Sequence, residues 1–315
     1  MPKTLVLADD LTGALECGVL IEGAVVTLFS PAQGSVAVAD TETRHVPPAQ
    51  ARQTVRRLTE QFPAEMIYKK TDSTLRGNIG AELAALPPGR IHYAPAHPHL
   101  GRTVRGGRLY VDGVPVEQTA FAGDPREPVT DGDLRRMLEL QGAPLERIVI
   151  HDGACEEDLE RAADALLAEP PPWLAAGPAG FLGVLVRRLG LARQPAPLPQ
   201  MPECLVINGS LHPASQAQMA AAEAAGVFCG RWRAGQIRDA AAAPGALIVF
   251  GGDTAREVLR GFGDPPLHPA AELAPGVVAS WFEAGPRRRW LITKAGGFGP
   301  PDLLIRLKAR LAGRP

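Results

Sequence analysis

A ten-residue segment, Lys69–Asn78, holds the densest group of chemically active side chains in the sequence. It reads Lys-Lys-Thr-Asp-Ser-Thr-Leu-Arg-Gly-Asn, with two lysines, an aspartate, three hydroxyl groups and an arginine. An arginine can bind a carboxylate through two parallel hydrogen bonds, and an aspartate can accept hydrogen bonds from sugar hydroxyl groups. The segment therefore predicts a site for a small polyhydroxy acid. The alternative is a solvated polar loop that leads into a helix over residues 79–86. The predicted contacts are Lys70, Thr71, Asp72, Ser73 and Arg76.

An apolar stretch over residues 66–68 precedes this segment and is typical of the end of a strand. Because ligands of open α/β sheets bind beyond the carboxyl ends of strands, the position of the segment agrees with its composition. Three more polar clusters in the first half of the sequence also lie at expected strand ends. They are Asp9, Asp10 and Thr12; Asp40 and Arg44; and His97, Arg102 and Arg105.

The adjacent aspartates Asp9 and Asp10 have two interpretations. At a turn both side chains could reach a ligand, where one could orient or deprotonate a hydroxyl group. Alternatively, they cap the helix that is expected to follow, since aspartate is a preferred residue at that position. The pair His97 and His99 has no nearby cysteine or third histidine, so hydrogen bonding or a plain loop is favoured over a zinc site.

The second half of the sequence shows one device three times: an apolar strand runs into a glycine-rich turn, and a helix follows. Backbone N–H groups exposed by glycine at the start of a helix make an anion site. None of the turns is a Walker A sequence or a G-x-G-x-x-G fingerprint, and each alone could be a tight connection. Together they predict a site for the phosphates of a nucleotide. The turns are Asn208–Ser210, Gly251–Thr254 and Lys294–Gly299.

The composition excludes several classes of protein. The 315 residues carry a net charge of -1, which indicates neither a nucleic-acid nor a membrane partner. The four cysteines have no paired spacing, as is typical of reduced thiols in a cytoplasmic protein. No apolar run is long enough to span a membrane, and the amino terminus enters a strand directly, so no signal peptide is expected. The basic run Arg287–Arg289 reads as a solvated loop.

The order of apolar and polar stretches predicts an α/β fold with parallel sheets. A proline-rich spacer over residues 194–202 divides the chain, and we place the two domains at 1–198 and 199–315. Each is expected to be a three-layer α/β domain with a mostly parallel sheet. An Asp-Gly turn predicts a hairpin over 109–116, which could contact a second copy of the chain in a homodimer. Strands are expected over 3–8, 24–29, 35–39, 65–68, 90–94, 147–151, 173–176, 204–207, 247–250 and 290–293, and helices over 49–61, 156–169 and 213–225.

A polyhydroxy-acid site in one half and a phosphate site in the other point to phosphoryl transfer, which relies on positioning and charge neutralisation, normally with Mg²⁺. At this point the motifs resemble the four-carbon acid sugar kinase family, in the family's order from residue 4 to residue 303. The resemblance implies an acid-sugar domain, a nucleotide domain, and an active site in the cleft between them. It also implies ATP-dependent phosphorylation of the terminal hydroxyl group of a tetronate or 3-oxo-tetronate. The matching motifs are Ala8–Ala14, Asp40–Arg44, Lys69–Gly80, Pro95–Arg102, Gly251–Ala255 and Lys294–Gly299.

The clusters and the resemblance together define the expected site, with ATP and Mg²⁺ as cofactors and no metal held by the protein alone. The expected catalytic residues are Asp9, Asp10 and Lys70, and Asp10 is favoured as the base although the sequence leaves both aspartates open. The expected substrate contacts are Asp9, Arg44, Lys70, Thr71, Asp72, Ser73, Arg76, His97 and Arg102. The expected ATP contacts are Ser210, Gly251, Gly252, Asp253, Thr254, Lys294, Gly296, Gly297 and Gly299.

The length of the chain and the spacing of its aspartates bear on two other functions. The chain is shorter than typical members of the family, with little room between Ser210 and Gly251, so walls of the adenine pocket could be missing. The chain could therefore be a non-catalytic paralogue that binds an acid sugar but has impaired ATP binding. A phosphatase of the haloacid dehalogenase type needs D-x-D-x-T, and the adjacent aspartates do not fit that spacing.

Overall fold

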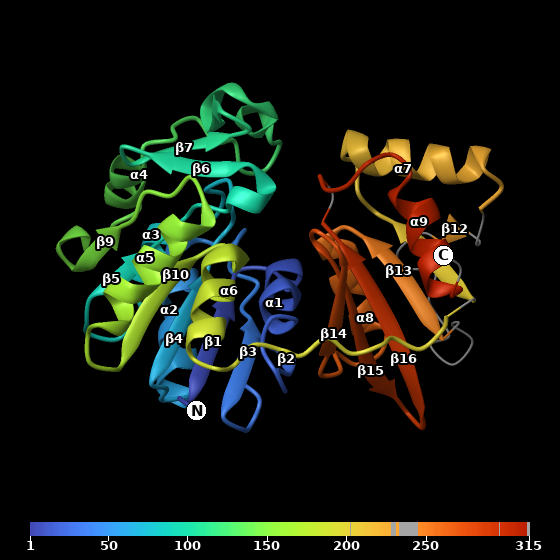
Figure 1. Cartoon of the computed structure of the whole chain (residues 1–315), viewed down its shortest axis with the longest axis horizontal. Coiled ribbons are helices and arrows are strands. Elements are labelled where there is room, and N and C mark those ends of the chain that lie inside the picture. Colours follow the sequence, from blue (N-terminus) through green and yellow to red (C-terminus); the bar gives the residue numbers. More distant parts are fainter. Residues whose placement is uncertain (202, 228–230, 233–244, 296, 314–315) are drawn as a thin grey trace. The chain divides into compact units, whose positions relative to one another are not determined.

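The computed structural model describes residues 1–315 except 202, 228–230, 233–244, 296 and 314–315 (Figure 1). The chain divides into two compact units, Met1–Arg193 and Gln194–Pro315. The proline-rich spacer predicted this division at residues 198/199, five residues later in the chain. None of the described helices has the length and apolar character that crossing a membrane requires.

Within its described residues, the first unit is built on a seven-stranded parallel sheet with the order β2-β3-β1-β4-β10-β5-β9. Both faces of such a sheet are covered, so its strands are continuous apolar runs; β1 is buried along its whole length. The strands are β1 (Thr4–Ala8), β2 (Val26–Leu28), β3 (Val36–Asp40), β4 (Met66–Lys70), β5 (Ile91–Tyr93), β9 (Ile148–Ile150) and β10 (Trp173–Gly177).

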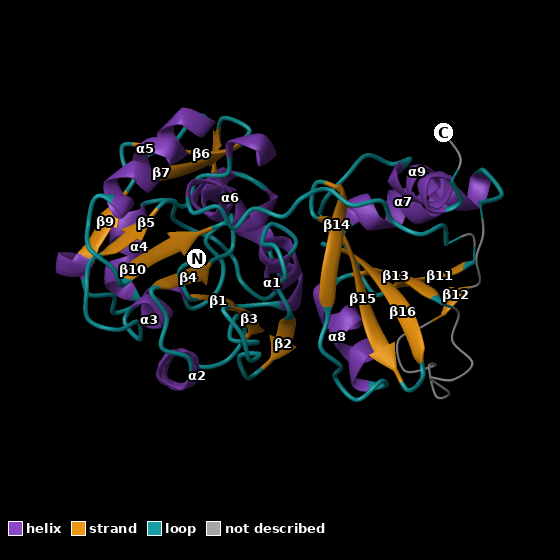
Figure 2. Ribbon diagram, turned by 60° about the horizontal axis from the view of Figure 1, so that its bottom comes forward, coloured by secondary structure: helices purple, strands orange, loops and turns teal. Residues whose placement is uncertain are grey.

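Helices cover the two faces of this sheet (Figure 2). Helix α6 (Ala179–Arg188) contacts both α1 (Leu11–Gly18) and α5 (Glu156–Leu167) on one face. On the other side α3 (Ile79–Leu83) contacts α2 (Pro48–Gln61) and α4 (Leu134–Leu140). The predicted three-layer α/β arrangement is therefore confirmed for this unit.

A small antiparallel sheet lies beside the large one and consists of β6 (Arg102–Arg105), β7 (Arg108–Val111) and β8 (Val114–Pro115). The predicted Asp-Gly hairpin joins β7 to β8, and both turn residues have positive φ, +50° at Asp112 and +81° at Gly113. Those angles suit the tight hairpin turns that favour this dipeptide. Strand β6 was not predicted, because its alternating charged residues resemble a loop.

The second unit contains a six-stranded sheet in its described part, with the order β12-β11-β13-β16-β15-β14. The first four strands are parallel, and β15 and β14 extend the sheet in antiparallel fashion. Helices α7 (Pro213–Ala224) and α9 (Leu303–Leu311) contact each other on one face, and α8 (Gly252–Arg260) lies on the other (Figure 1). The strands are β11 (Cys204–Asn208), β12 (Arg231–Trp232), β13 (Ala246–Phe250), β14 (His268–Ala274), β15 (Val277–Ala284) and β16 (Arg287–Lys294).

The prediction of a solvated loop at residues 287–289 is wrong, because these arginines begin β16. Arg288 pairs with Glu283 of β15, and its guanidinium carbon lies 3.9 Å from the centre of the Trp281 ring. Arg289 is buried, with its guanidinium carbon 5.5 Å from the centre of the Phe262 ring. Long arginine stems can pack along apolar surface and stack on aromatic rings, so a run of charges does not by itself indicate a loop.

Candidate active site

Three neighbouring strands of the first unit deliver the predicted acid-sugar residues to one edge of the sheet. Ala8, the last residue of β1, is in register with Asp40 of β3 and with Lys70 of β4. Side chains that follow these three positions must therefore meet at the carboxyl edge, where parallel sheets bind their ligands. The geometry brings together the Asp9 pair, the Arg44 turn and the segment after Lys70.

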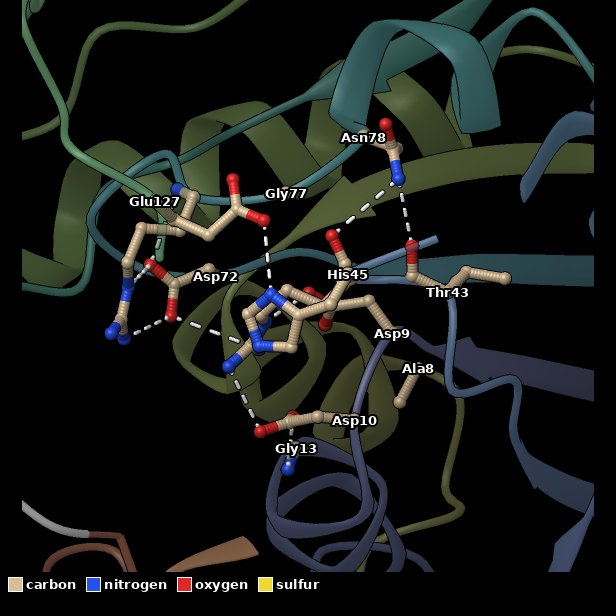
Figure 3. Close-up of polar contacts among 12 residues, drawn as sticks. Ala8, Asp9, Asp10, Gly13, Thr43, His45, Asp72, Gly77, Asn78 and Glu127 are labelled. Carbon is tan, nitrogen blue, oxygen red and sulfur yellow. Dashed lines mark hydrogen bonds and ion pairs between the residues drawn. The ribbon is translucent and has the colours of Figure 1, made fainter. Parts of the chain in front are cut away.

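Arg44 contacts three carboxylates of this cluster, and Figure 3 shows Asp9, Asp10 and Asp72 gathered at this edge of the sheet. Its Nε donates to Asp9 Oδ2 at 2.6 Å, its Nη1 lies 3.0 Å from Asp10 Oδ2, and its Nη2 lies 3.7 Å from Asp72 Oδ1. Burial by itself would lower the pKa of Arg44, but Asp10, Asp9 and Asp72 together raise it well above its usual value. The permanent positive charge of Arg44 therefore holds together three carboxylates, which follow the ends of two strands.

The two adjacent aspartates have different partners. Asp10 caps α1, since its Oδ1 accepts from the Gly13 N–H at 2.9 Å and its Oδ2 accepts from the Thr12 hydroxyl at 2.6 Å. Burial opposes ionisation of Asp10, but Arg44 and Lys70 outweigh it and lower the pKa. The capping interpretation thus holds for Asp10 without removing it from the cluster.

Asp9 keeps an unused acceptor. One oxygen of its buried carboxylate is bound by Arg44, whereas Oδ1 is buried and has no hydrogen-bond partner among the described residues. A buried carboxylate oxygen without a partner is costly unless a ligand supplies a donor. A hydroxyl group of a bound sugar acid would supply it.

Lys70 and Lys69 point to opposite faces of β4, as side chains of a strand alternate. Lys70 is nearly buried, with Nζ 3.9 Å from Glu16 Oε2; burial would lower its pKa, but Glu16, Asp9 and Asp10 raise it. Lys69 is fully buried in an ion pair with Glu82, with 3.0 Å between Nζ and Oε2. The predicted strand ended at residue 68, so the structure moves both lysines from a loop into the strand.

Arg76 binds the Asp72 carboxylate through two hydrogen bonds, at 3.0 Å from Nε to Oδ2 and 2.9 Å from Nη2 to Oδ1. Burial raises the pKa of Asp72, but Arg76 and Arg44 bring it well below its usual value. A third donor of Arg76, Nη1, binds Asp124 Oδ2 at 3.1 Å. The bidentate geometry expected for a substrate carboxylate is thus used within the protein, and a substrate contact by Arg76 stays a prediction.

The remaining predicted substrate contacts lie around this centre. His97 and Arg102 face each other through backbone hydrogen bonds, and burial followed by the charge of Lys70 lowers the pKa of His97 to about 4. The guanidinium carbons of Arg76 and Arg102 lie 5.4 and 5.9 Å from the centre of the Phe121 ring.

Phe121 and Asp124 were not predicted from the sequence, because they belong to a short segment without strand or helix periodicity. Of the two predicted hydroxyl contacts, Thr71 is fully buried and Ser73 is half-buried.

In the second unit the three glycine-rich turns approach one another. A Cβ atom on Gly209 would lie 1.8 Å from Thr254 Oγ1, and a Cβ on Gly297 would lie 3.3 Å from His212 Nε2. Gly251, which has φ +101°, precedes α8 as its N-cap and makes no side-chain capping bond. The first turn of α8, Gly252 to Thr254, thus starts beside the other two turns.

Other details of these turns bear on the predicted ATP contacts. The Ser210 hydroxyl accepts from the His212 N–H at 3.2 Å, and His212 was missed because it is a single residue in an unremarkable turn. Lys294 is fully buried, with 3.0 Å between its Nζ and Ser215 Oγ, and burial lowers its pKa to about 8. Gly296 lies outside the described residues. A contact between Lys294 and phosphate stays a prediction.

Comparison with known proteins places these features in a family. Residues 4–147 match the model of a sugar-binding N-terminal domain. The chain is 33% identical over 394 residues to D-threonate kinase of Cupriavidus necator, in an alignment that covers 94% of each chain. The chain belongs to the four-carbon acid sugar kinase family. A second D-threonate kinase, from Salmonella typhimurium, is 32% identical over 259 residues, covering 69% of this chain and 60% of the relative.

Two further comparisons bear on size and fold. The alignment with the Cupriavidus kinase, at 394 residues, is longer than the chain of 315, so that kinase has positions that this chain lacks. A crystal structure of a Haemophilus influenzae protein superposes with a TM-score of 0.74 at 20% identity, covering 98% of this chain and all of that one. That similarity shows the fold alone.

Proposed function

We propose that the chain is an ATP-dependent kinase that phosphorylates the terminal hydroxyl group of a tetronate or 3-oxo-tetronate. The observation that carries the proposal is the buried cluster of Asp9, Asp10, Arg44 and Lys70, in which Asp9 Oδ1 lacks a donor. Fixed positive charge beside open carboxylate oxygens suits a ligand that has one carboxylate and several hydroxyl groups. The relatives named D-threonate kinase support the same substrate class.

In the proposed reaction the side chains have separate tasks. Arg44 and Lys70 attract the carboxylate of the acid, and Asp9 accepts a hydrogen bond from one of its hydroxyl groups. Asp10, which its neighbours keep ionised, orients the reacting hydroxyl group and accepts its proton. A loose phosphoryl-transfer step needs little basicity, so a carboxylate of low pKa is adequate for this role.

The second unit has features that fit a nucleotide. The N-cap of α8 is Gly251, which has positive φ and no side chain that could cap the helix, and the backbone N–H groups at the start of a helix are suited to phosphate oxygens. Mg²⁺ is usually held by phosphates with one or two carboxylates, and Asp253 in the first turn of α8 is such a carboxylate. When bound, Mg²⁺-ATP would supply the transferable phosphoryl group and neutralise its charge.

The test is a coupled assay of ADP release with Mg²⁺-ATP against a panel of tetronates and 3-oxo-tetronates, using the wild type and Asp10→Asn. Asparagine keeps an oxygen that can cap α1 but lacks the charge and the basic oxygen. We expect turnover on one acid, and a fall in kcat of about 10²-fold or more in the variant. Turnover that Asp10→Asn leaves unchanged would remove Asp10 from the mechanism, and no turnover on any acid would contradict the kinase proposal.

A second candidate function is a paralogue that binds the acid sugar but has impaired ATP binding. The observation that favours it is the shorter chain, which lacks positions present in the Cupriavidus relative. Isothermal titration distinguishes the two proposals. Binding of an acid without binding of Mg²⁺-ATP or a nonhydrolysable ATP analogue supports the paralogue, and binding of both supports the kinase.

A further inference from the structure

In each unit, one amide side chain holds a strand-end turn by its backbone carbonyl groups. In the first unit the amide belongs to Asn78, which precedes α3. Its Nδ2 donates at 2.8 Å to the carbonyl of Thr43 and at 2.8 Å to that of Val46, and lies 3.5 Å from that of Arg44. Thr43 and Val46 lie on either side of Arg44 in the chain, so one NH₂ group holds the backbone before and after the residue that presents the guanidinium; Figure 3 shows the contact with Thr43.

The neighbouring residues make this contact specific to the Arg44 turn. Gly77 has φ +89°, and a Cβ atom there would lie 3.2 Å from Arg44 Cγ and 3.5 Å from Asp9 Oδ2. The backbone beside Asn78 therefore lies directly against the arginine stem. A second, more exposed contact also holds the Arg44 turn: His45 Nδ1 lies 2.9 Å from Glu127 Oε1.

Gln218 of α7 makes the corresponding contact in the second unit. Its Nε2 lies 2.9 Å from the carbonyl oxygens of Phe298 and Gly299 and 3.0 Å from that of Pro300. Gln218 is fully buried, and Gly299 has φ +87° where the turn passes it. The opposite orientation of the amide would place its oxygen against three carbonyl oxygens, so the donor must face the turn.

Each amide thus binds carbonyls of a segment distant in sequence, 32–35 residues away for Asn78 and 80–82 for Gln218. Each amide binds a turn of its own unit, so the two act on separate turns. Backbone groups that are not paired in a helix or sheet need such partners when they are buried. Loss of the amide would leave the carbonyls unpaired and free the turn to change its path.

We propose that Asn78 and Gln218 are positioning residues with separate targets: Asn78 sets Arg44 for the acid sugar, and Gln218 sets the Gly297–Pro300 turn for the nucleotide. This inference rests on the proposed function for the assignment of substrates to the two units. Neither side chain touches a substrate in this scheme. Each acts through the turn that it holds.

The test compares KM for the acid and KM for ATP in Asn78→Ala and Gln218→Ala, so each variant serves as the control for the other. We expect Asn78→Ala to raise KM for the acid at least tenfold and to change KM for ATP less than twofold. Gln218→Ala is expected to do the reverse. A merely structural defect would lower the melting temperature or the active fraction and would not divide the two KM values in this crossed pattern.

Two further sets of variants keep the test decisive if alanine prevents folding. Asn78→Asp and Gln218→Glu are nearly isosteric but replace the NH₂ donors by oxygen, and the same crossed pattern is expected. Gln141→Ala is the matched control. The Gln141 side-chain amide binds the Gly77 carbonyl and the Gly80 N–H, which lie in the segment that contains Asn78 but outside the Arg44 turn. It should leave KM for the acid within twofold.

A binding cycle tests whether Asn78 acts through Arg44. In an Arg44→Lys background, Asn78→Ala should no longer weaken acid binding, measured by calorimetry without ATP. Equal increases in both KM values, or an undiminished effect in that background, would overturn the inference. These results require a wild type that turns over, so failure of the kinase proposal is recognised separately by absent turnover in the wild type.

Discussion

At the scale of single residues, Asp40 is a buried carboxyl group next to the candidate site, and its ionisation is unfavourable in the folded protein. It is fully buried at the end of β3, and one oxygen accepts from the Glu42 N–H at 3.0 Å. Burial and the nearby charge of Glu42 raise the pKa of Asp40 well above its ordinary value. The folded protein therefore binds the Asp40 proton more tightly than the unfolded chain does.

This shift has a definite sign for stability. For an acid with a raised folded-state pKa, the protein is most stable where both states are protonated and loses stability as the pH rises above the ordinary aspartate pKa. Asp40→Asn removes the ionisation, and its amide can still accept from Glu42. We expect the melting temperature at pH 8 to rise by about 2–4 °C, corresponding to ~1 kcal/mol, and the gain to shrink as the pH falls towards 4.

Differential scanning calorimetry across this pH range checks the prediction. Asp164→Asn is the control, because Asp164 is exposed on α5 and its surface ion pair with Arg188 should contribute little. A lower melting temperature for Asp40→Asn at pH 8, with a loss that shrinks as the pH falls towards 4, would show that the carboxylate, not the neutral acid, is the favoured form in the folded protein.

At the scale of elements, β4 and α3 are joined by the buried pair of Lys69 and Glu82. Glu82 also accepts a hydrogen bond from the Thr43 hydroxyl, so the pair connects β4 and α3 to the Arg44 turn. Burial first of all raises the pKa of Glu82, while Lys69 opposes the shift. Removing one partner leaves the other charge buried and alone, which costs about 3–5 kcal/mol.

A double-mutant cycle tests this connection. We expect Lys69→Met alone to lower the free energy of unfolding by about 3–5 kcal/mol, measured by urea denaturation. Lys69→Met combined with Glu82→Gln should recover most of that loss, because glutamine is neutral and can still accept from Thr43. A double variant as unstable as Lys69→Met alone would mean that the cost comes from packing and not from an unpaired charge.

The same elements show what the sequence can and cannot predict. Buried parallel strands such as β1 are continuous apolar runs between turn residues, so their places were predicted within a few residues. The same is true of α2, α5 and α7, whereas α4 and α6 were not predicted. Lys69 and Lys70 were excluded from β4, and β14 and β15 were missed, because tertiary partners override local pattern there. An ion pair with Glu82 makes a lysine acceptable in a buried strand.

The candidate site also has features that the sequence predicts and features that it does not. Convergence of Asp9, Arg44 and Asp72 follows from the rule that parallel strands end at one edge, and the sequence was sufficient for it. The contacts that hold the surrounding groups were not predictable. Asp124 binds Arg76 and Asn78 binds the Arg44 turn, in both cases across tens of residues. Such contacts depend on the three-dimensional path of loops that have no periodicity.

At the scale of the whole molecule, each unit has a hydrophobic core of its own. The core of the second unit is formed entirely by residues between 201 and 311. The second unit begins with the segment Gln194–Gln200, which is largely exposed and has proline at every second position from 195 to 199. Alternating proline favours an extended, semi-rigid chain, and units with separate cores can unfold separately.

We therefore expect two transitions in calorimetry of the full chain, each sensitive to one ligand. A sugar acid at a hundred times its Kd should stabilise the first unit by about 2.7 kcal/mol and leave the other transition in place. A nonhydrolysable ATP analogue with Mg²⁺ should raise only the transition of the second unit. Fluorescence provides an independent assignment, since Trp232, Trp281 and Trp290 belong to the second unit and Trp173 to the first.

The pattern of shifts discriminates between the proposals because a ligand stabilises only the unit that binds it. Shifts by both ligands support the kinase, whereas a shift by the acid alone supports the paralogue with impaired ATP binding. A single transition moved by either ligand would contradict independent unfolding of the units. An acid that raised only the transition reported by Trp281 and Trp290 would reverse the assignment of substrates to units, and with it the roles proposed for Arg44 and Gln218.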